Sequence, residues 1–328
     1  MKGRIGIREE TRAAVTLALA APILTELFSA NMSPRQLFNP LGFFLAGFIG
    51  YGAPVLLIRE LAVRWRVGLP GLFLMGVAYG VFNEGIIAKT LFHDNPASMV
   101  HYPNFAPGGV QVVWAAMICT WHALHAVVFP IALVSLLYPR VRQHSWLGLP
   151  IRILLLAMLV IFGGLFCANA RPEYATRQNL AGSFAVMALL FALATRLRSN
   201  VPFFEARQQG RGLQVGLGAG FYPIYFFGFV ALAALGPPPW VVLLWPLALV
   251  LAAYLLTHRA RWVSFVPVAY IALGDYTIGS FLNMLVNLGG RAYDKAAALL
   301  VLLLAFAIAT AIALRRAKKM ATADSPSA

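Results

Sequence analysis

Apolar residues occur in long runs that alternate with short polar segments along the whole chain. A helix needs about 20 mostly apolar residues to cross the hydrocarbon core of a bilayer. Ten runs approach or exceed this length, and each predicts one membrane span. The pattern therefore predicts an all-α fold, a polytopic transmembrane helix bundle, with spans at 13–30, 40–58, 69–91, 110–138, 150–168, 180–195, 213–235, 240–257, 262–285 and 296–314.

Basic residues gather in every second segment between these spans. If both termini lie in the cytoplasm, 20 of the 26 Lys and Arg residues fall on the inner side and 6 on the outer side. Such a bias is the usual mark of orientation in membrane proteins. We therefore expect a multi-pass protein of a cell (inner or plasma) membrane with its N- and C-termini in the cytoplasm.

The same pattern predicts one domain, because the segments between spans are short. Residues 1–12 are expected to form a basic cytoplasmic N-terminus, and residues 13–314 a single transmembrane helical domain. Residues 315–328 are expected to form a cytoplasmic tail without ordered structure, because they combine charged, small and proline residues.

Composition supports a membrane protein over a soluble one. Of the 328 residues, 60% are hydrophobic and 11% are charged, whereas soluble domains carry about 25% charged residues. A soluble enzyme is excluded, because a fold of this size cannot bury so much apolar surface. The net charge of +15 is explained by membrane lipid head groups as partners, with no nucleic acid.

Polar residues inside the predicted spans are the candidate functional residues, because ionisable groups at membrane depth are costly. At about 1.5 Å per residue, several of them lie about 20 Å from the start of their span. Four separate spans thus bring polar groups to a similar depth, which predicts one polar chamber that opens to the outside. The candidates are Glu26, Asn83, Glu84, Lys89, His122, His125, Asp275 and Asn283.

Glu84 is the most informative of these residues. Lys89 follows it by five positions, about 140° around a helix, so the two are not ideal partners. We expect Glu84 to meet His122 or His125 on the next span, and Lys89 to extend outward to the membrane surface. The alternative is a buried ion pair that only sets the register of the helices.

His122 and His125 are three positions apart, which places them on one side of a regular helix. This spacing suits a shared metal, a proton relay or an acid–base pair with Glu84. No second metal-ligand motif accompanies the histidines, so no metal is predicted and the cofactor remains unknown. Gly274 beside Asp275 predicts that the ninth span opens at a binding point.

Two further local patterns predict packing rather than chemistry. Glu60 and Arg64 have the spacing of a surface ion pair along a helix. Glycines four apart let helix backbones approach closely in membranes. They predict close packing at Gly76, Gly80, Gly212, Gly216 and Gly220.

The segment 80–130 resembles the CPBP family of glutamate-dependent intramembrane proteases, which includes the CAAX-processing enzymes. Glu84 has a base nearby on its span, and Trp121 and His125 fit an aromatic-xxx-His element on the next span. The resemblance implies that Glu84 acts as general base on water and that His125 or His122 stabilises the oxyanion. Three features depart from the family pattern: Asn83 replaces the first acid, Lys89 lies five residues beyond Glu84, and no His-xxx-Asn element follows.

Three functions remain open at this point. The first is an intramembrane hydrolase that uses Glu84 with His122 or His125 on a membrane-embedded peptide or lipid substrate. The second is a proton- or cation-coupled carrier or channel that uses Glu26, Glu84 and Asp275. The third is a non-catalytic membrane subunit whose polar residues hold the bundle together. Further substrate- or ion-binding residues in the first two functions are Asn83, Lys89 and Asn283.

Overall fold

The computed structural model describes residues 8–93, 102, 105–169, 172–197, 210–259 and 265–323. Within these ranges the protein is all-α and contains no strand. Ten long helical segments follow the ten predicted ranges. They are α1 (Glu9–Pro22) with η1 (Ile23–Leu27); α3 (Pro40–Gly42), η2 (Phe43–Gly52) and α4 (Ala53–Trp65); α5 (Leu69–Val81) with η3 (Phe82–Ile87); α6 (Val112–Trp121), η6 (His122–Val128) and α7 (Phe129–Leu137); α8 (Leu149–Asn169); α9 (Arg177–Arg196); α10 (Arg211–Tyr222), η8 (Pro223–Phe227) and α11 (Gly228–Ala234); α12 (Pro239–Arg259); α13 (Phe265–Gly289); and α14 (Tyr293–Ala323).

Short helices occupy some of the connections between these segments. They are α2 (Pro34–Leu37), η5 (Pro107–Gly109) and η7 (Pro172–Tyr174). Ser33 and Asn39 begin α2 and α3 with side-chain caps, since their oxygens accept hydrogen bonds from the first backbone N–H groups. The chain is therefore held in a defined path between the first two long segments.

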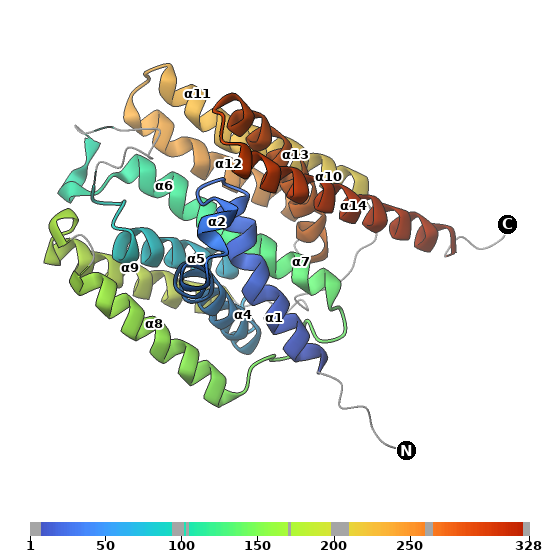
Figure 1. Ribbon diagram of the computed structural model, residues 1–328, viewed down its shortest axis with the longest axis horizontal. Helices are drawn as coiled ribbons and strands as arrows, with labels where there is room; N and C mark the ends of the chain where they lie inside the picture. Colours follow the sequence, from blue (N-terminus) through green and yellow to red (C-terminus); the bar gives the residue numbers. More distant parts are fainter. Residues whose placement is uncertain are drawn as a thin grey trace.

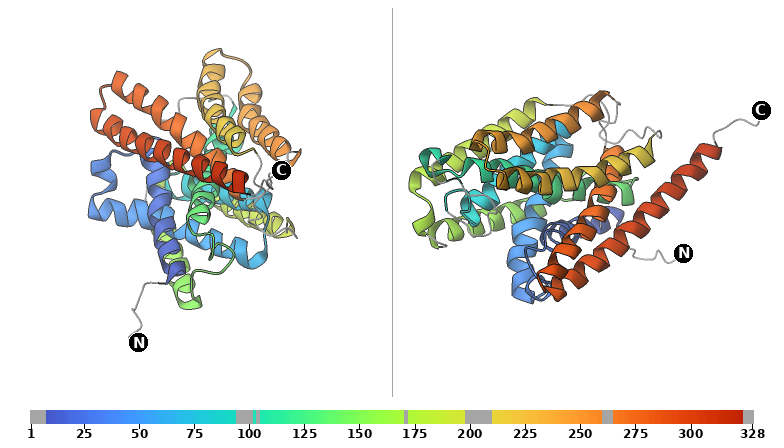
Figure 2. Two further views of the ribbon diagram at one scale, coloured as in Figure 1. Left: turned by 90° about the vertical axis from the view of Figure 1, so that its right-hand side faces the viewer. Right: turned by 90° about the horizontal axis from the view of Figure 1, so that it is seen from above.

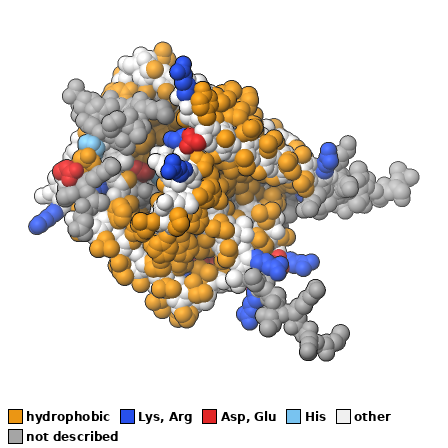
Figure 3. All heavy atoms as spheres, viewed as in Figure 1, with side chains coloured by type: hydrophobic (Ala, Val, Ile, Leu, Met, Phe, Trp, Pro, Cys, Tyr) orange, Lys and Arg blue, Asp and Glu red, His pale blue; other side chains and the backbone are white. Residues whose placement is uncertain are grey.

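Eight of the long segments are long and apolar enough to cross a membrane. The two outside this set are Glu9–Leu27 and Phe265–Gly289, which carry Glu26 and Asp275. The predicted count of ten spans therefore stays a prediction. Large hydrophobic side chains are exposed over much of the described surface (Figure 3), as expected where a protein faces lipid.

The segment Pro107–Leu137 lies at the centre of the bundle, since 89% of its most apolar stretch is buried. On one side α5 packs against α6 and η6, and α9 packs against α5. On the other side α13 packs against α7 and is itself flanked by α10 and α14 (Figures 1 and 2). The central segment therefore lies between most of the N-terminal helices (α1–α5, α8 and α9) and the C-terminal helices (α10–α14), while α14 also contacts α2 and η1 directly.

Close helix packing occurs at only some of the predicted glycines. A Cβ atom added to Gly76 or Gly80 would lie 2.7 Å from a backbone atom of the central segment, as predicted. A Cβ atom added to Gly212, Gly216 or Gly220 would have no neighbour within 4 Å among the described residues, so the close packing predicted at these three glycines is wrong. The glycine of α10 that packs closely is Gly218, which lies between Gly216 and Gly220.

Gly218 and Gly274 make the contact between α10 and α13 instead. A Cβ atom on either would lie within 2 Å of a backbone carbonyl oxygen of the other helix, 1.8 Å for Gly218 and 1.9 Å for Gly274. The predicted opening of the helix at Gly274 is wrong, because α13 continues through it. The glycine serves close packing rather than a break.

Five stretches of the long helices are π-helical: η1, η2, η3, η6 and η8. Proline lies within two positions of four of them, at Pro22, Pro54, Pro130 and Pro223. Proline lacks the N–H that closes a regular helical turn, so carbonyl groups before it are released from their usual partners. π-Helical turns are frequent at functional sites, and these turns carry most of the candidate polar residues.

Arg59 and Glu60 form a buried link rather than the surface pair predicted for Glu60 and Arg64. Both Arg59 and Glu60 are 1% exposed, and their charged groups are 2.6 Å apart. The Trp146 backbone N–H donates to Glu60 at 2.9 Å, and the Trp146 ring lies under the Arg59 guanidinium. Ser145 also donates to Glu60. The pair thus fastens α4 to the connection between α7 and α8.

The C-terminal tail is shorter than predicted. The helix α14 continues to Ala323, so residues 315–323 are helical rather than without ordered structure. Residues 324–328 lie outside the described residues. The start of α1 and the end of α14 lie toward the same end of the bundle (Figures 1 and 2).

Candidate functional site

The predicted polar residues are removed from solvent, whichever helix they come from. Asn83 is half-buried, and every other candidate is buried. The buried residues, with their exposed fractions, are Glu26 (5%), Glu84 (9%), Lys89 (1%), His122 (2%), His125 (0%), Asp275 (0%) and Asn283 (6%).

Glu84 and His122 form the first carboxylate–imidazole pair. Nε2 of His122 lies 2.8 Å from Oε1 of Glu84, which confirms the predicted contact between the two spans. The other carboxylate oxygen accepts a hydrogen bond from the Thr90 hydroxyl, and Trp114 Nε1 donates to that hydroxyl at 3.1 Å. Both oxygens of Glu84 thus have a partner.

Glu26 adjoins this pair through an aromatic residue. Its carboxylate accepts hydrogen bonds from the Tyr51 hydroxyl and from Nδ2 of Asn31, the latter at 2.7 Å. The Tyr51 ring stacks on the His122 ring with 6.0 Å between centroids. Three separate helices, η1, η2 and η6, therefore meet here. Tyr51 was missed by sequence reasoning, because a tyrosine in an apolar run carries no signal of its own.

His125 and Asp275 form a second pair that joins η6 to α13. Nε2 of His125 lies 2.9 Å from Oδ2 of Asp275, and both side chains are fully buried. The Trp121 ring stacks on the His125 ring with 3.9 Å between centroids, and the Tyr276 hydroxyl donates to the His125 carbonyl at 2.9 Å. Nδ1 of His125 and Oδ1 of Asp275 have no hydrogen-bond partner within the described residues.

The two histidines therefore contact acids on two different helices. The prediction that they lie on one side of a regular helix is wrong: His122 contacts Glu84 of η3, and His125 contacts Asp275 of α13. The physical reason is that η6 is π-helical. Its wider turn changes the angle between side chains three positions apart from that of a regular helix.

Lys89 and Asn83 lie next to Glu84 in the chain but make other contacts. Lys89 is buried, with Nζ 3.3 Å from the Cys167 carbonyl, so the prediction that it extends outward is wrong. Asn83 donates to the Tyr79 hydroxyl at 3.1 Å. Lys89, two residues after η3, thus ties this region to α8, whereas the bond of Asn83 stays within its own helical segment.

Asn283 occupies the C-terminal helices, away from Glu84. Its Oδ1 accepts a hydrogen bond from the Tyr222 hydroxyl at 2.8 Å, and its Nδ2 donates to the Phe28 carbonyl at 2.7 Å. Phe28 in turn packs on the His125 ring with 5.4 Å between centroids. Asn283 therefore holds α13 against the end of α10 and the residue that follows η1, beside the second pair.

The predicted polar residues meet in pairs, and the two large cavities lie elsewhere. Two apolar cavities, of about 380 and 450 Å³, lie between helices, and neither is lined by a predicted site residue. Within the described residues, no group of three or more His, Cys, Asp or Glu side chains has the arrangement of a metal site. The agreement in depth therefore corresponds to contacts between specific side chains.

The chemistry available to this arrangement is proton exchange. An acid and an imidazole in contact hold a proton on either partner, and a buried charge without a partner is expensive. Each pair is thus stable as a unit and sensitive to the gain or loss of a single proton. Two such units lie on one π-helical segment.

Comparisons with known proteins give one result. A family model described as an uncharacterized membrane protein family matches residues 15–314. No curated protein and no solved structure matches the chain.

The comparisons show no resemblance to the CPBP family. In the structure the histidine of the aromatic-xxx-His element, His125, pairs with Asp275 rather than with Glu84. The family model, in contrast, matches residues 15–314, which include most of the described bundle. The protein belongs to an uncharacterized membrane protein family.

Proposed function

We propose that the protein is a proton-coupled carrier in which the two carboxylate–imidazole pairs bind protons. The observation that carries this proposal is the position of η6 between two acids of different helices. His122 contacts Glu84 on the N-terminal side at 2.8 Å, and His125 contacts Asp275 on the C-terminal side at 2.9 Å.

Protonation of either pair changes how the central segment is held. With both partners charged, the pair attracts strongly in an apolar interior. With one proton more (acid protonated, imidazole charged) or one proton fewer (acid charged, imidazole neutral), the attraction between opposite charges is lost. Because α13 carries Asp275 and packs along α10 and α14, a proton at the second pair would loosen three helices from the centre together. Carriers move in this way, by shifting one packed group of helices against another.

Glu26 extends the first pair toward the N-terminal helices. The Tyr51 hydroxyl donates to Glu26 while its ring stacks on His122. The Tyr51 hydroxyl thus holds the Glu26 carboxylate beside the His122 ring, so a proton that binds Glu26 lies next to the first pair. We assign Glu26 and Tyr51 to the path by which a proton reaches His122, and Asn83, Lys89 and Asn283 to positioning.

An intramembrane hydrolase is the second candidate, favoured by the same 2.8 Å contact of Glu84 and His122. A carboxylate with an imidazole partner is the geometry of a general base. This function also requires water and substrate beside Glu84, whose side chain is 11% exposed. The carrier uses both pairs, whereas the hydrolase uses one.

Charge movement after a pH step tests the carrier. The purified protein in proteoliposomes is adsorbed to a solid-supported membrane, and the current after a rapid pH change is recorded. Protons that bind deep in the membrane move charge through part of its thickness, so the wild type should give a transient current. Glu84→Gln and Asp275→Asn should each reduce it, and the double variant should abolish it.

Exposed acids provide matched controls for these variants. Glu173→Gln and Asp294→Asn make the same chemical changes at exposed positions and should leave the current unchanged. A wild-type response equal to that of empty liposomes would contradict the proposal. Loss of cleavage of membrane-embedded peptides in Glu84→Gln, with Asp275→Asn still active, would support the hydrolase instead.

We also infer that both termini lie in the cytoplasm of an inner or plasma membrane. The support is the bias of 20 of 26 basic residues and the common end of the bundle at which α1 begins and α14 ends (Figure 1). A reporter that is active only in the cytoplasm, fused after Ala328, should be active. Activity of an exported reporter at that position would reverse the orientation.

A further inference from the structure

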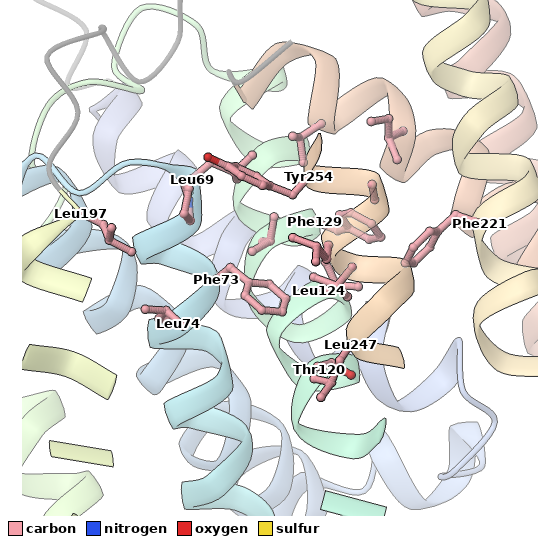
Figure 4. Close-up of a pocket in the computed structure, with 17 residues that line it drawn as sticks. Leu69, Phe73, Leu74, Thr120, Leu124, Phe129, Leu197, Phe221, Leu247 and Tyr254 are labelled. Carbon is pink, nitrogen blue, oxygen red and sulfur yellow. The ribbon is translucent and has the colours of Figure 1, made fainter. Parts of the chain in front are cut away.

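The cavity of about 380 Å³ lies between the N-terminal and the C-terminal helices. Figure 4 shows Leu69 and Tyr254 near one end of it, and Leu247 and Thr120 near the other. Its walls come from α5, from the central segment and from α10, α12 and α13. Its volume falls in the range of ligand pockets, about 300–1,000 Å³.

The lining of this cavity selects an apolar ligand. Leucine, phenylalanine, valine, proline, isoleucine and alanine side chains make up most of it. The Thr120 hydroxyl is already bonded, because it donates to the Ala116 carbonyl at 2.6 Å and contacts the Tyr225 hydroxyl. Tyr254 is the other lining residue with a side-chain hydroxyl, and it lies near Leu69 at one end (Figure 4), so the rest of the cavity offers a ligand apolar contacts.

The hydrocarbon of the bilayer is the source of such a ligand. Leu247 and Leu251 line the cavity and are also 44% and 57% exposed on the outer surface of α12. The cavity thus adjoins a surface that faces lipid. An acyl chain can enter from the side without crossing a polar layer.

Basic residues adjoin the end of the cavity formed by Leu69 and Leu197. Leu197 follows Arg196 directly, and its carbonyl accepts a hydrogen bond from Gly68 N–H at 3.0 Å. Gly68 lies two positions after Arg66. Arg66 and Arg196 are both exposed, and each lies within two positions of the hydrogen bond between Gly68 and Leu197 at this end. They suit the phosphate of a lipid head group.

We propose that this cavity binds one acyl chain of an anionic phospholipid, whose head group lies at Arg66 and Arg196. The site is separate from the two carboxylate–imidazole pairs and does not depend on the carrier function. The bound chain would contact Leu124 and Val128, which line the cavity from η6, the segment that carries both histidines. Lipid binding and the packing of η6 are therefore linked.

Native mass spectrometry of the protein released from nanodiscs tests this site. The nanodiscs contain equal amounts of phosphatidylglycerol and phosphatidylcholine, which differ in head-group charge. The wild type should retain one phosphatidylglycerol in preference to phosphatidylcholine. The double variant Arg66→Gln with Arg196→Gln should reduce that preference about 10- to 30-fold, since each basic residue near the surface contributes about 1 kcal/mol.

A second variant tests the acyl-chain part of the proposal. Leu124→Trp fills the cavity and should lower retention of both lipids, whereas Leu154→Trp, at a position 59% exposed on α8, is the matched control and should lower neither. Retention of lipid at the wild-type level in Leu124→Trp would overturn the site. An unchanged lipid preference in the double arginine variant, which alters only exposed residues, would also overturn it.

Discussion

The two carboxylate–imidazole pairs have the same chemistry in different surroundings. Glu84 is 9% exposed, and both of its oxygens are bonded, one to His122 and one to Thr90. Asp275 is fully buried, and its Oδ1 has no partner within the described residues. The first pair belongs to a hydrogen-bonded network, whereas the second depends on its own contact and on the aromatic rings around it.

This difference separates two roles. A carboxylate with several neutral donors tolerates a change of its histidine partner, because other bonds remain. A carboxylate with one partner in an apolar interior depends on that partner almost completely. We therefore expect the second pair to be critical for the packing of the bundle, and the first to be the more independent proton site.

Breaking the second pair should have the largest effect on stability. Asp275→Ala leaves His125 without its acid in a fully buried position and should lower the free energy of unfolding by about 3–5 kcal/mol. The measurement is unfolding in mixed micelles with increasing SDS, followed by tryptophan fluorescence. Replacing both partners, with Asp275→Leu and His125→Phe, should cost less than the single change. A single variant as stable as the wild type would remove the distinction between the pairs.

Forcing α10 and α13 apart at Gly274, next to Asp275 of the second pair, should have the next largest effect on stability. Gly274→Ala places a methyl group within 2 Å of the Val215 carbonyl oxygen, and overpacking of this kind costs about 1–3 kcal/mol or more. Gly216→Ala is the matched control, because nothing lies within 4 Å of that position. The same unfolding assay should show a loss for Gly274→Ala alone. Equal stability of both variants would mean that α10 and α13 separate easily.

Changing the first pair should affect function more than folding. Glu84→Gln preserves the shape of the side chain and can still accept a bond from Thr90, so we expect a loss of about 1–2 kcal/mol in stability. The charge movement described above should fall nevertheless, because an amide does not take up the proton. Loss of folded protein in Glu84→Gln would show instead that the pair sets the register of the helices.

Removing the phenol between Glu26 and His122 should have the smallest effect. Tyr51→Phe keeps the ring on His122 but deletes the donor to Glu26, which should cost about 1 kcal/mol. The charge movement should become slower without disappearing, as expected for a residue on the path rather than at the binding group. Tyr293→Phe, at a residue 64% exposed, is the control. Identical kinetics in Tyr51→Phe and the wild type would exclude Tyr51 from the path.

The local pattern of the chain was sufficient to locate the helices and to narrow the partner of Glu84 to His122 or His125, of which the structure shows His122. Both follow from short-range features: apolar runs of membrane length, and polar groups at matching depths on consecutive spans. The buried contacts of Glu60 could not be predicted in this way, because its partners Ser145 and Trp146 come from a connection far along the chain. Residues so distant in sequence meet only once the bundle has formed.

The amino-acid sequence by itself determined that the protein is an all-α membrane protein and which costly polar groups its helices carry, because the bilayer imposes length and apolarity on every span. The tertiary structure alone decided how those groups combine. The π-helical turn of η6 directs His122 and His125 to different acids, and the close approach at Gly218 and Gly274 encloses Asp275. Both depend on backbone geometry and on contacts between distant helices, which no spacing along a single span encodes.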